Sequence, residues 1–89
     1  MSNKEFPDFN YELNSSLLHI GKKFAGIRHT RNEKLMTVAR AINVSHSVIS
    51  EIENGRYIGL SMALLIKLAS YYQITLNELF VSAPGETGT

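Results

Sequence analysis

The chain of 89 residues contains no cysteine, which excludes disulfide bonds and thiolate metal sites and permits a reducing cytoplasm. It also contains no long apolar run. Its most apolar stretch, MALLIKLA at residues 62–69, is interrupted by Lys67 and is too short to span a bilayer. The first residues do not combine a basic segment with an apolar one, so no signal peptide is expected. These absences favour a cytoplasmic protein that does not contact membranes.

The net charge is only +1, but the charges are unevenly distributed. Residues 1–15 hold one lysine and three acidic residues, a net charge of −2. Residues 16–80 hold eight basic and four acidic residues, a net charge of +4. A compact body with this excess suits contacts to nucleic-acid phosphates, although ordinary soluble surfaces often carry a similar excess.

The length suffices for one small domain with a single core. Apolar residues recur every three or four positions, and no segment alternates as a strand would. We therefore expect an all-α domain of five helices over residues 16–81, preceded by an N-terminal arm at 1–15 and followed by a disordered tail at 82–89. Three aromatic residues in the arm favour its packing on the core or on a partner subunit.

Polar residues mark the ends of several predicted helices. The first helix should run from Ser15 or Ser16 to Arg31, and Asn32 should close it in the left-handed conformation. Farther along, Ser61 is a good N-cap for a fourth helix. A capping box of Thr75 and Glu78 should open a short fifth helix.

The segment from Leu35 to Arg56 reads as two short helices around one tight turn. Asn43 enters the left-handed conformation cheaply and can turn the chain, and Ser45 can cap the helix at residues 46–54. The apolar residues of both helices fall on one face each. They are Leu35, Val38, Ala39 and Ile42 in the first helix, and Ile49 and Ile52 in the second.

This segment resembles the lambda-repressor-like, or Cro/Xre-type, helix-turn-helix family of bacterial and phage transcriptional regulators. The resemblance spans about residues 16–80 and rests on Val44-Ser45 followed by the pattern IxxIENG, with Ala39, Asn43 and Ile49 at positions where the family prefers Ala, Gly and Ile. Lys34 is a departure, because the family usually has a Ser or Thr cap there. The resemblance implies a regulator, most simply a repressor, that binds double-stranded DNA in a sequence-specific manner.

The resemblance also implies which side chains face the DNA bases: His46, Ser47 and Glu51, with Ser50 nearby. A helix fits the major groove, where His46 could donate to guanine and Glu51 could accept from the amino group of cytosine. The alternative interpretation is an ordinary polar surface. Because Glu51 repels phosphates, it would discriminate among sites rather than add affinity.

Other residues are expected to contact phosphates or to hold the helices in place. The candidates for phosphate contacts are Asn54 and Arg56, with Arg40 and Lys34 as weaker ones. In the family, an Arg of the first helix pairs with a Glu of the reading helix. Arg28 and Glu53 are therefore expected to form a structural ion pair.

Enzymatic and metal-binding interpretations fail on spacing. GKKFAG at residues 21–26 has the two glycines of a P-loop, but Ile27 and Arg28 follow where Lys and Ser or Thr are required. The three histidines show no HExxH spacing, and no GxSxG motif occurs. We expect no catalytic residues, no cofactor and no metal.

Three functions remain open from the sequence. The first is a regulator that binds a two-fold symmetric operator as a homodimer, because one short helix reads only a few base pairs. The second is an antitoxin of the same fold whose N-terminal arm binds a protein partner. The third is a protein-interaction module that has lost DNA binding, which Glu51 and the low net charge favour.

Overall fold

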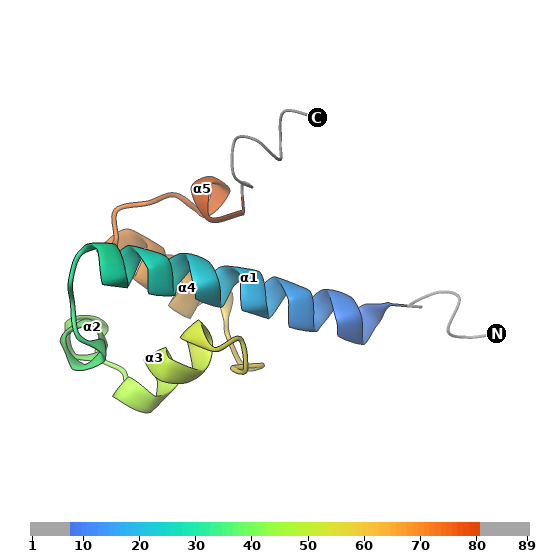
Figure 1. The fold of residues 1–89 in the computed structure, drawn as a ribbon, viewed down its shortest axis with the longest axis horizontal. Helices are drawn as coiled ribbons and strands as arrows, with labels where there is room; N and C mark the ends of the chain where they lie inside the picture. The colour runs from blue at the N-terminus through green and yellow to red at the C-terminus, as the bar shows by residue number, and fades with distance from the viewer. Residues whose placement is uncertain (1–7, 81–89) are drawn as a thin grey trace.

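The computed structural model describes residues 8–80 and contains five helices and no strand in that range, which confirms the all-α prediction. The predicted tail at 82–89 and the first seven residues of the arm lie outside the described residues. In Figure 1, α2 and α3 lie on one side of α1, α5 lies on the other, and α4 passes behind. The helices are α1 (Phe9–Thr30), α2 (Leu35–Ile42), α3 (His46–Glu53), α4 (Met62–Tyr71) and α5 (Leu76–Phe80).

Helix α1 begins at Phe9, so the prediction of a start at Ser15 or Ser16 was wrong. The spacing of Leu17 and the later core residues continues back through Leu13 to Phe9, and this periodicity carries the helix into the predicted arm. The first turns of α1 extend beyond the other helices (Figure 1). Part of the arm is therefore a helical projection that does not pack on the core of its own domain.

One apolar core joins all five helices. Phe24, Val38, Ile49, Ile52, Leu68 and Leu79 are the largest side chains that are almost completely buried. Burying a side chain of this size stabilises the fold by about 1.5–3 kcal/mol. The remaining members are Leu17, Ile20, Ala39, Ile42, Leu65, Ala69 and Tyr72.

Two turns of the same design follow α2 and α4. Asn43 ends α2 with φ 61°, and the amide of the next residue, Val44, donates to the Ala39 carbonyl. Gln73 follows α4 with the same φ, and the amide of Ile74 donates to the Ala69 carbonyl. Left-handed Asn43 was expected, but left-handed Gln73 was not, because Gln has no special preference for that conformation.

The predicted caps are present. The Ser45 hydroxyl accepts from the Val48 amide, and the Ser61 hydroxyl accepts from the Leu64 amide. At the start of α5, the Glu78 carboxylate accepts from the Thr75 amide while the Thr75 hydroxyl accepts from the Glu78 amide, each at 3.0 Å. These side chains satisfy amides that a helix start leaves without intrahelical partners.

Gly21 allows α1 and the end of α3 to touch through their backbones. A methyl group on Gly21 would overlap the Ile52 carbonyl oxygen and lie 2.7 Å from the Glu53 carbonyl oxygen. Gly55 also lies close to α1, because a methyl group there would be 2.8 Å from the Leu18 Cα. The absence of side chains at these two positions sets the distance between the helices.

We predict that Gly21→Ala lowers the free energy of unfolding by about 2 kcal/mol or more, because the contacted atoms belong to backbone that cannot move aside cheaply. Gly26→Ala is the matched control in the same helix, since no atom lies within 4 Å of the position that its added methyl group would take. It should raise stability by up to about 1 kcal/mol through helix propensity. Urea denaturation of both variants measures the difference, and equal stabilities would contradict the close-contact argument.

Candidate nucleic-acid interface

Helix α3 separates a buried apolar face from an exposed polar one. Ile49 and Ile52 are at most 2% exposed and pack in the core. His46, Ser47 and Glu51 are exposed, and Ser50 is half-buried beside them. The sequence-predicted reading residues therefore share the side of α3 that faces away from the core, and a ligand could reach them together.

The Ser45 cap lies just before this polar face. Its side chain is occupied by the Val48 amide, so His46 and Ser47 project from a fixed first turn. The first turn of α3 contains no acidic residue. The positive end of the helix dipole there is consequently not neutralised by a side chain of that turn.

The two candidates after α3 differ in their surroundings. The Asn54 side-chain amide donates to the Ser50 carbonyl at 2.9 Å, which ties it to the end of the helix. Arg56 has an exposed side chain, and its backbone amide donates to the Glu51 carbonyl. Of these two residues, Arg56 can therefore extend its charged side chain toward a phosphate. Asn54 is held by its hydrogen bond, so its remaining polar atoms stay at a fixed position.

At the start of α2, the departure from the family pattern has a structural effect. Lys34 occupies the N-cap position and makes no side-chain cap, although its carbonyl accepts from the Thr37 and Val38 amides. Lys34 and Arg40 are both exposed. The first turn of α2 can therefore offer uncapped amides together with a lysine to an anion.

Arg28 and Glu53 form a bidentate ion pair between α1 and the end of α3. Arg28 Nε donates to one Glu53 oxygen at 2.7 Å, and Nη2 donates to the other at 3.0 Å. Arg28 Nη1 also donates to the Glu33 carbonyl at 2.7 Å. The hydrogen bond to Glu53 raises the pKa of Arg28, and both side chains are only about a tenth exposed. One guanidinium thus connects α1, α3 and the loop before α2.

A second polar cluster next to this pair was not found by sequence reasoning. The Tyr71 hydroxyl donates to Glu33 Oε2 at 2.8 Å, and Arg31 lies 3.5 Å from the same oxygen. The Arg31 guanidinium also lies 5.3 Å from the ring centroids of Tyr71 and Tyr72. Tyr71 and Glu33 are 38 residues apart and meet only because the end of α4 lies against the loop between α1 and α2, so no local pattern could have indicated the cluster.

Hydrogen bonding and burial change the acidity of these tyrosines. The hydrogen bond to Glu33 raises the pKa of Tyr71 above its usual value of 10. Burial raises the pKa of Tyr72 further, where the ring stacks on Phe24 with 5.9 Å between centroids. Both groups therefore favour the neutral form in the folded state.

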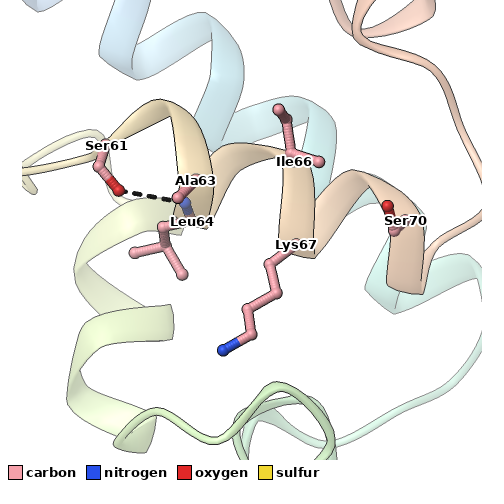
Figure 2. A pocket seen from close by; sticks show the side chains of 6 residues that line it. All are labelled: Ser61, Ala63, Leu64, Ile66, Lys67 and Ser70. Atoms are coloured by element: carbon pink, nitrogen blue, oxygen red, sulfur yellow. Dashed lines mark hydrogen bonds between the residues drawn. The ribbon is translucent and has the colours of Figure 1, made fainter.

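A shallow hollow of about 560 Å³ lies along the outer side of α4 (Figure 2). It is lined by Ser61, Leu64, Ile66, Lys67 and Ser70 among others, and Lys67 is its one charged residue. Within residues 8–80, no cluster of His, Cys, Asp and Glu is placed to hold a metal ion, and no helix is long and apolar enough to cross a membrane.

A protein-family model described as helix-turn-helix matches residues 27–79, which is more than half of the chain. The chain therefore belongs to the lambda-repressor-like, Cro/C1-type helix-turn-helix family. This is a family of DNA-binding transcriptional regulators and is not typically enzymatic, so the domain is a DNA-binding regulatory domain. Comparisons with curated proteins and with solved structures gave no significant match.

We predict that Glu53→Gln lowers the free energy of unfolding by about 3 kcal/mol, because it leaves the largely buried Arg28 charge without its partner. Arg28→Met should cost at least as much, since it also removes the bond to the Glu33 carbonyl. The double variant should lose less than the sum of the two, which a double-mutant cycle by urea denaturation measures. Additive losses would show that the pair is not coupled.

We also predict a loss of stability at alkaline pH. The pKa values of Tyr71 and Tyr72 in the folded state lie above the unfolded value of about 10, so both tyrosines contribute to stability below pH 10. This contribution disappears as the pH rises through their folded-state pKa values. The free energy of unfolding, measured by urea denaturation between about pH 8 and 11, should decline as the pH rises. Tyr72→Phe should make this decline of stability smaller. It should not lower the free energy of unfolding at neutral pH, because the buried Tyr72 hydroxyl has no hydrogen-bond partner.

Proposed function

We propose that the protein is a repressor that binds a two-fold symmetric operator as a homodimer and acts in the cytoplasm, where bacterial DNA lies. The observation that carries the proposal is the exposed polar face of α3. Its buried face is fixed by the core, while His46, Ser47 and Glu51 project outward from the capped first turns. Occupying the operator is sufficient to block polymerase, so repression requires no additional surface.

In this proposal, α3 lies in the major groove and its residues make different contacts with the DNA. His46 donates to guanine, Glu51 accepts from the amino group of cytosine, and Ser47 and Ser50 contact bases or nearby phosphates. Arg56, Asn54, Lys34 and Arg40 contact the phosphates that flank the groove. Arg28 and Glu53 stay out of contact with DNA and hold α3 at its angle to α1.

Dimeric binding follows from the size of the reading surface. Helix α3 has eight residues, so one copy reads only a few base pairs. Two copies on half-sites one helical turn apart, about 10 base pairs, multiply affinity and specificity. The exposed carboxylate of Glu51 favours one competing hypothesis, a protein-interaction module that does not bind DNA. Such a module would lack operator affinity even at low salt.

Selection from random DNA duplexes at about 150 mM salt tests the proposal, because backbone attraction alone does not dominate there. We expect an enriched palindrome whose half-sites lie about 10 base pairs apart. His46→Ala and Glu51→Ala should each relax particular positions of that sequence, with losses of about 1–3 kcal/mol in discrimination. Arg56→Ala should weaken all sequences alike and reduce the salt dependence.

Ser70→Ala is the control for this experiment, because Ser70 is an exposed residue of α4 outside the proposed reading surface. Its binding profile should match that of the unaltered protein. A folded protein that enriches no sequence would contradict the proposal and favour the interaction module. Uniform weakening by His46→Ala and Glu51→Ala would instead contradict their assignment as base-reading residues.

A further inference from the structure

Residues 8–16, at the start of α1, form a helical projection beyond the rest of the domain (Figure 1). Two contacts mark the edge from which it projects. Leu18 lies against Gly55 of the loop after α3, and His19 Nε2 lies 3.2 Å from the Leu79 carbonyl oxygen of α5. The projection therefore precedes the points at which this loop and α5 meet α1.

The apolar side of α1 that faces the core continues into the projection. Phe9, Leu13 and Leu17 are spaced by four residues, so they lie on one side of the helix. Leu17 is buried in the core, Leu13 is half-buried, and Phe9 is 60% exposed. Tyr11, which is 71% exposed, lies on the opposite side, because two residues turn the helix by about 200°. The side that is buried within the domain is thus exposed at Phe9.

The edge of the domain beside the projection also exposes apolar side chains. Ile58, three residues after Gly55, is 70% exposed, and Phe80, next to Leu79, is 52% exposed. Single exposed apolar residues are ordinary, but these lie at the same end of the domain as the projection. Because the projection points away from its own edge, it can cover the edge of a second molecule but not its own (Figure 1).

The charges of the two surfaces are complementary. The projection holds Asp8 and Glu12 and no basic residue. Residues 54–75, from the end of α3 to the start of α5, hold Arg56 and Lys67 and no acidic residue. Phosphates repel the carboxylates of the projection, whereas this positive segment attracts them. A second copy of this chain is therefore a better partner for the projection than DNA is.

We propose that the projections of two copies pack antiparallel through the side that carries Phe9 and Leu13. The two Leu13 side chains meet at the centre, and Phe9 of each copy lies against the edge that exposes Ile58 and Phe80 in the other. The contact is isologous, so assembly stops at two copies. Only residues 8–16 of α1 take part, so α5 keeps its place on α1 at His19. This inference rests on the proposed homodimer and specifies its surface.

The helical repeat places both α3 helices on the same side of this pair. Gly21, which faces α3, follows Leu13 by eight residues, so the two positions lie about a quarter turn apart around α1. The two-fold axis of an antiparallel pair is perpendicular to the helices and to the direction in which they meet. It therefore runs along the direction of α3. Rotation about this axis keeps both α3 helices on one side, as two half-sites on one face of DNA require.

Cross-linking tests the pairing. The projection has nine residues, fewer than the 20–30 per side of a standard interface, so the dimer is weak in solution and must be captured covalently. The chain has no cysteine of its own. Leu13→Cys places two thiols at the two-fold axis and should give a disulfide-linked dimer under mild oxidation. Tyr11→Cys is the matched control on the opposite side of the same turns. It should cross-link at least about 10-fold more slowly, although its greater exposure favours chance collisions.

A second substitution in the Leu13→Cys protein tests the place of the Phe9 ring. Phe9→Ser should slow cross-linking at least about 10-fold, because the buried area of an aromatic ring is lost from both ends of the interface. Tyr11→Ser removes an exposed aromatic ring from the opposite side and should leave the rate within about 3-fold. Equal effects of the two substitutions would contradict the pairing. Circular dichroism verifies that each variant is folded.

The outcomes separate this inference from the proposed function. If Leu13→Cys cross-links no faster than Tyr11→Cys, the pairing is wrong, and a dimer through another surface stands. If only one copy of the unaltered protein binds a duplex with two half-sites, both the pairing and the homodimer are wrong. The linked Leu13→Cys dimer should bind the selected duplex at least as tightly as the unlinked protein, and loss of binding would contradict the placement of both α3 helices on one side. Reading of a single half-site by α3 is measured separately.

Discussion

The contact between α1 and the C-terminal end of α3 determines how the polar face of α3 is presented. Gly21 lets the two backbones approach, and the bidentate bond from Arg28 to Glu53 fixes the rotation of α3 at that distance. A planar guanidinium that holds two carboxylate oxygens constrains direction as well as separation. Burial of Ile49 and Ile52 then decides which side of α3 remains exposed. The reading surface is thus a consequence of packing on its opposite side.

Much of the fold could be predicted because its signals are local. Asn43 in the left-handed conformation, the Ser45 and Ser61 caps and the capping box of Thr75 with Glu78 all depend on neighbouring residues. The early start of α1 was missed because acids and Pro7 suggested a loose arm, whereas helical periodicity continued through it. The hydrogen bond from Tyr71 to Glu33 was missed because only tertiary packing brings these two residues together.

For the candidate site, the helical periodicity of the sequence was enough to predict which side chains of α3 are exposed. It was not enough to predict the hydrogen bonds that these side chains make. Exposure of His46, Ser47 and Glu51 follows from burial of Ile49 and Ile52 on the other side of the helix. The engagement of the Asn54 amide by the Ser50 carbonyl depends on a side-chain rotamer, which no spacing rule specifies. Contacts with bases and phosphates stay predictions, because they depend on a partner molecule that the chain itself does not contain.

The left-handed turn at Gln73 has a consequence for local opening of the native state. A left-handed conformation costs a residue of this type about 1–2 kcal/mol relative to the right-handed one, a penalty that Asn43 largely avoids. Helix α5, which follows this turn, has five residues and is too short to be stable alone. It is therefore held by burial of Leu79 and by its capping box rather than by its connection. In native-state hydrogen exchange, the amides of α5 should exchange through a small opening, while those of α3 and of the part of α1 that packs in the core require global unfolding.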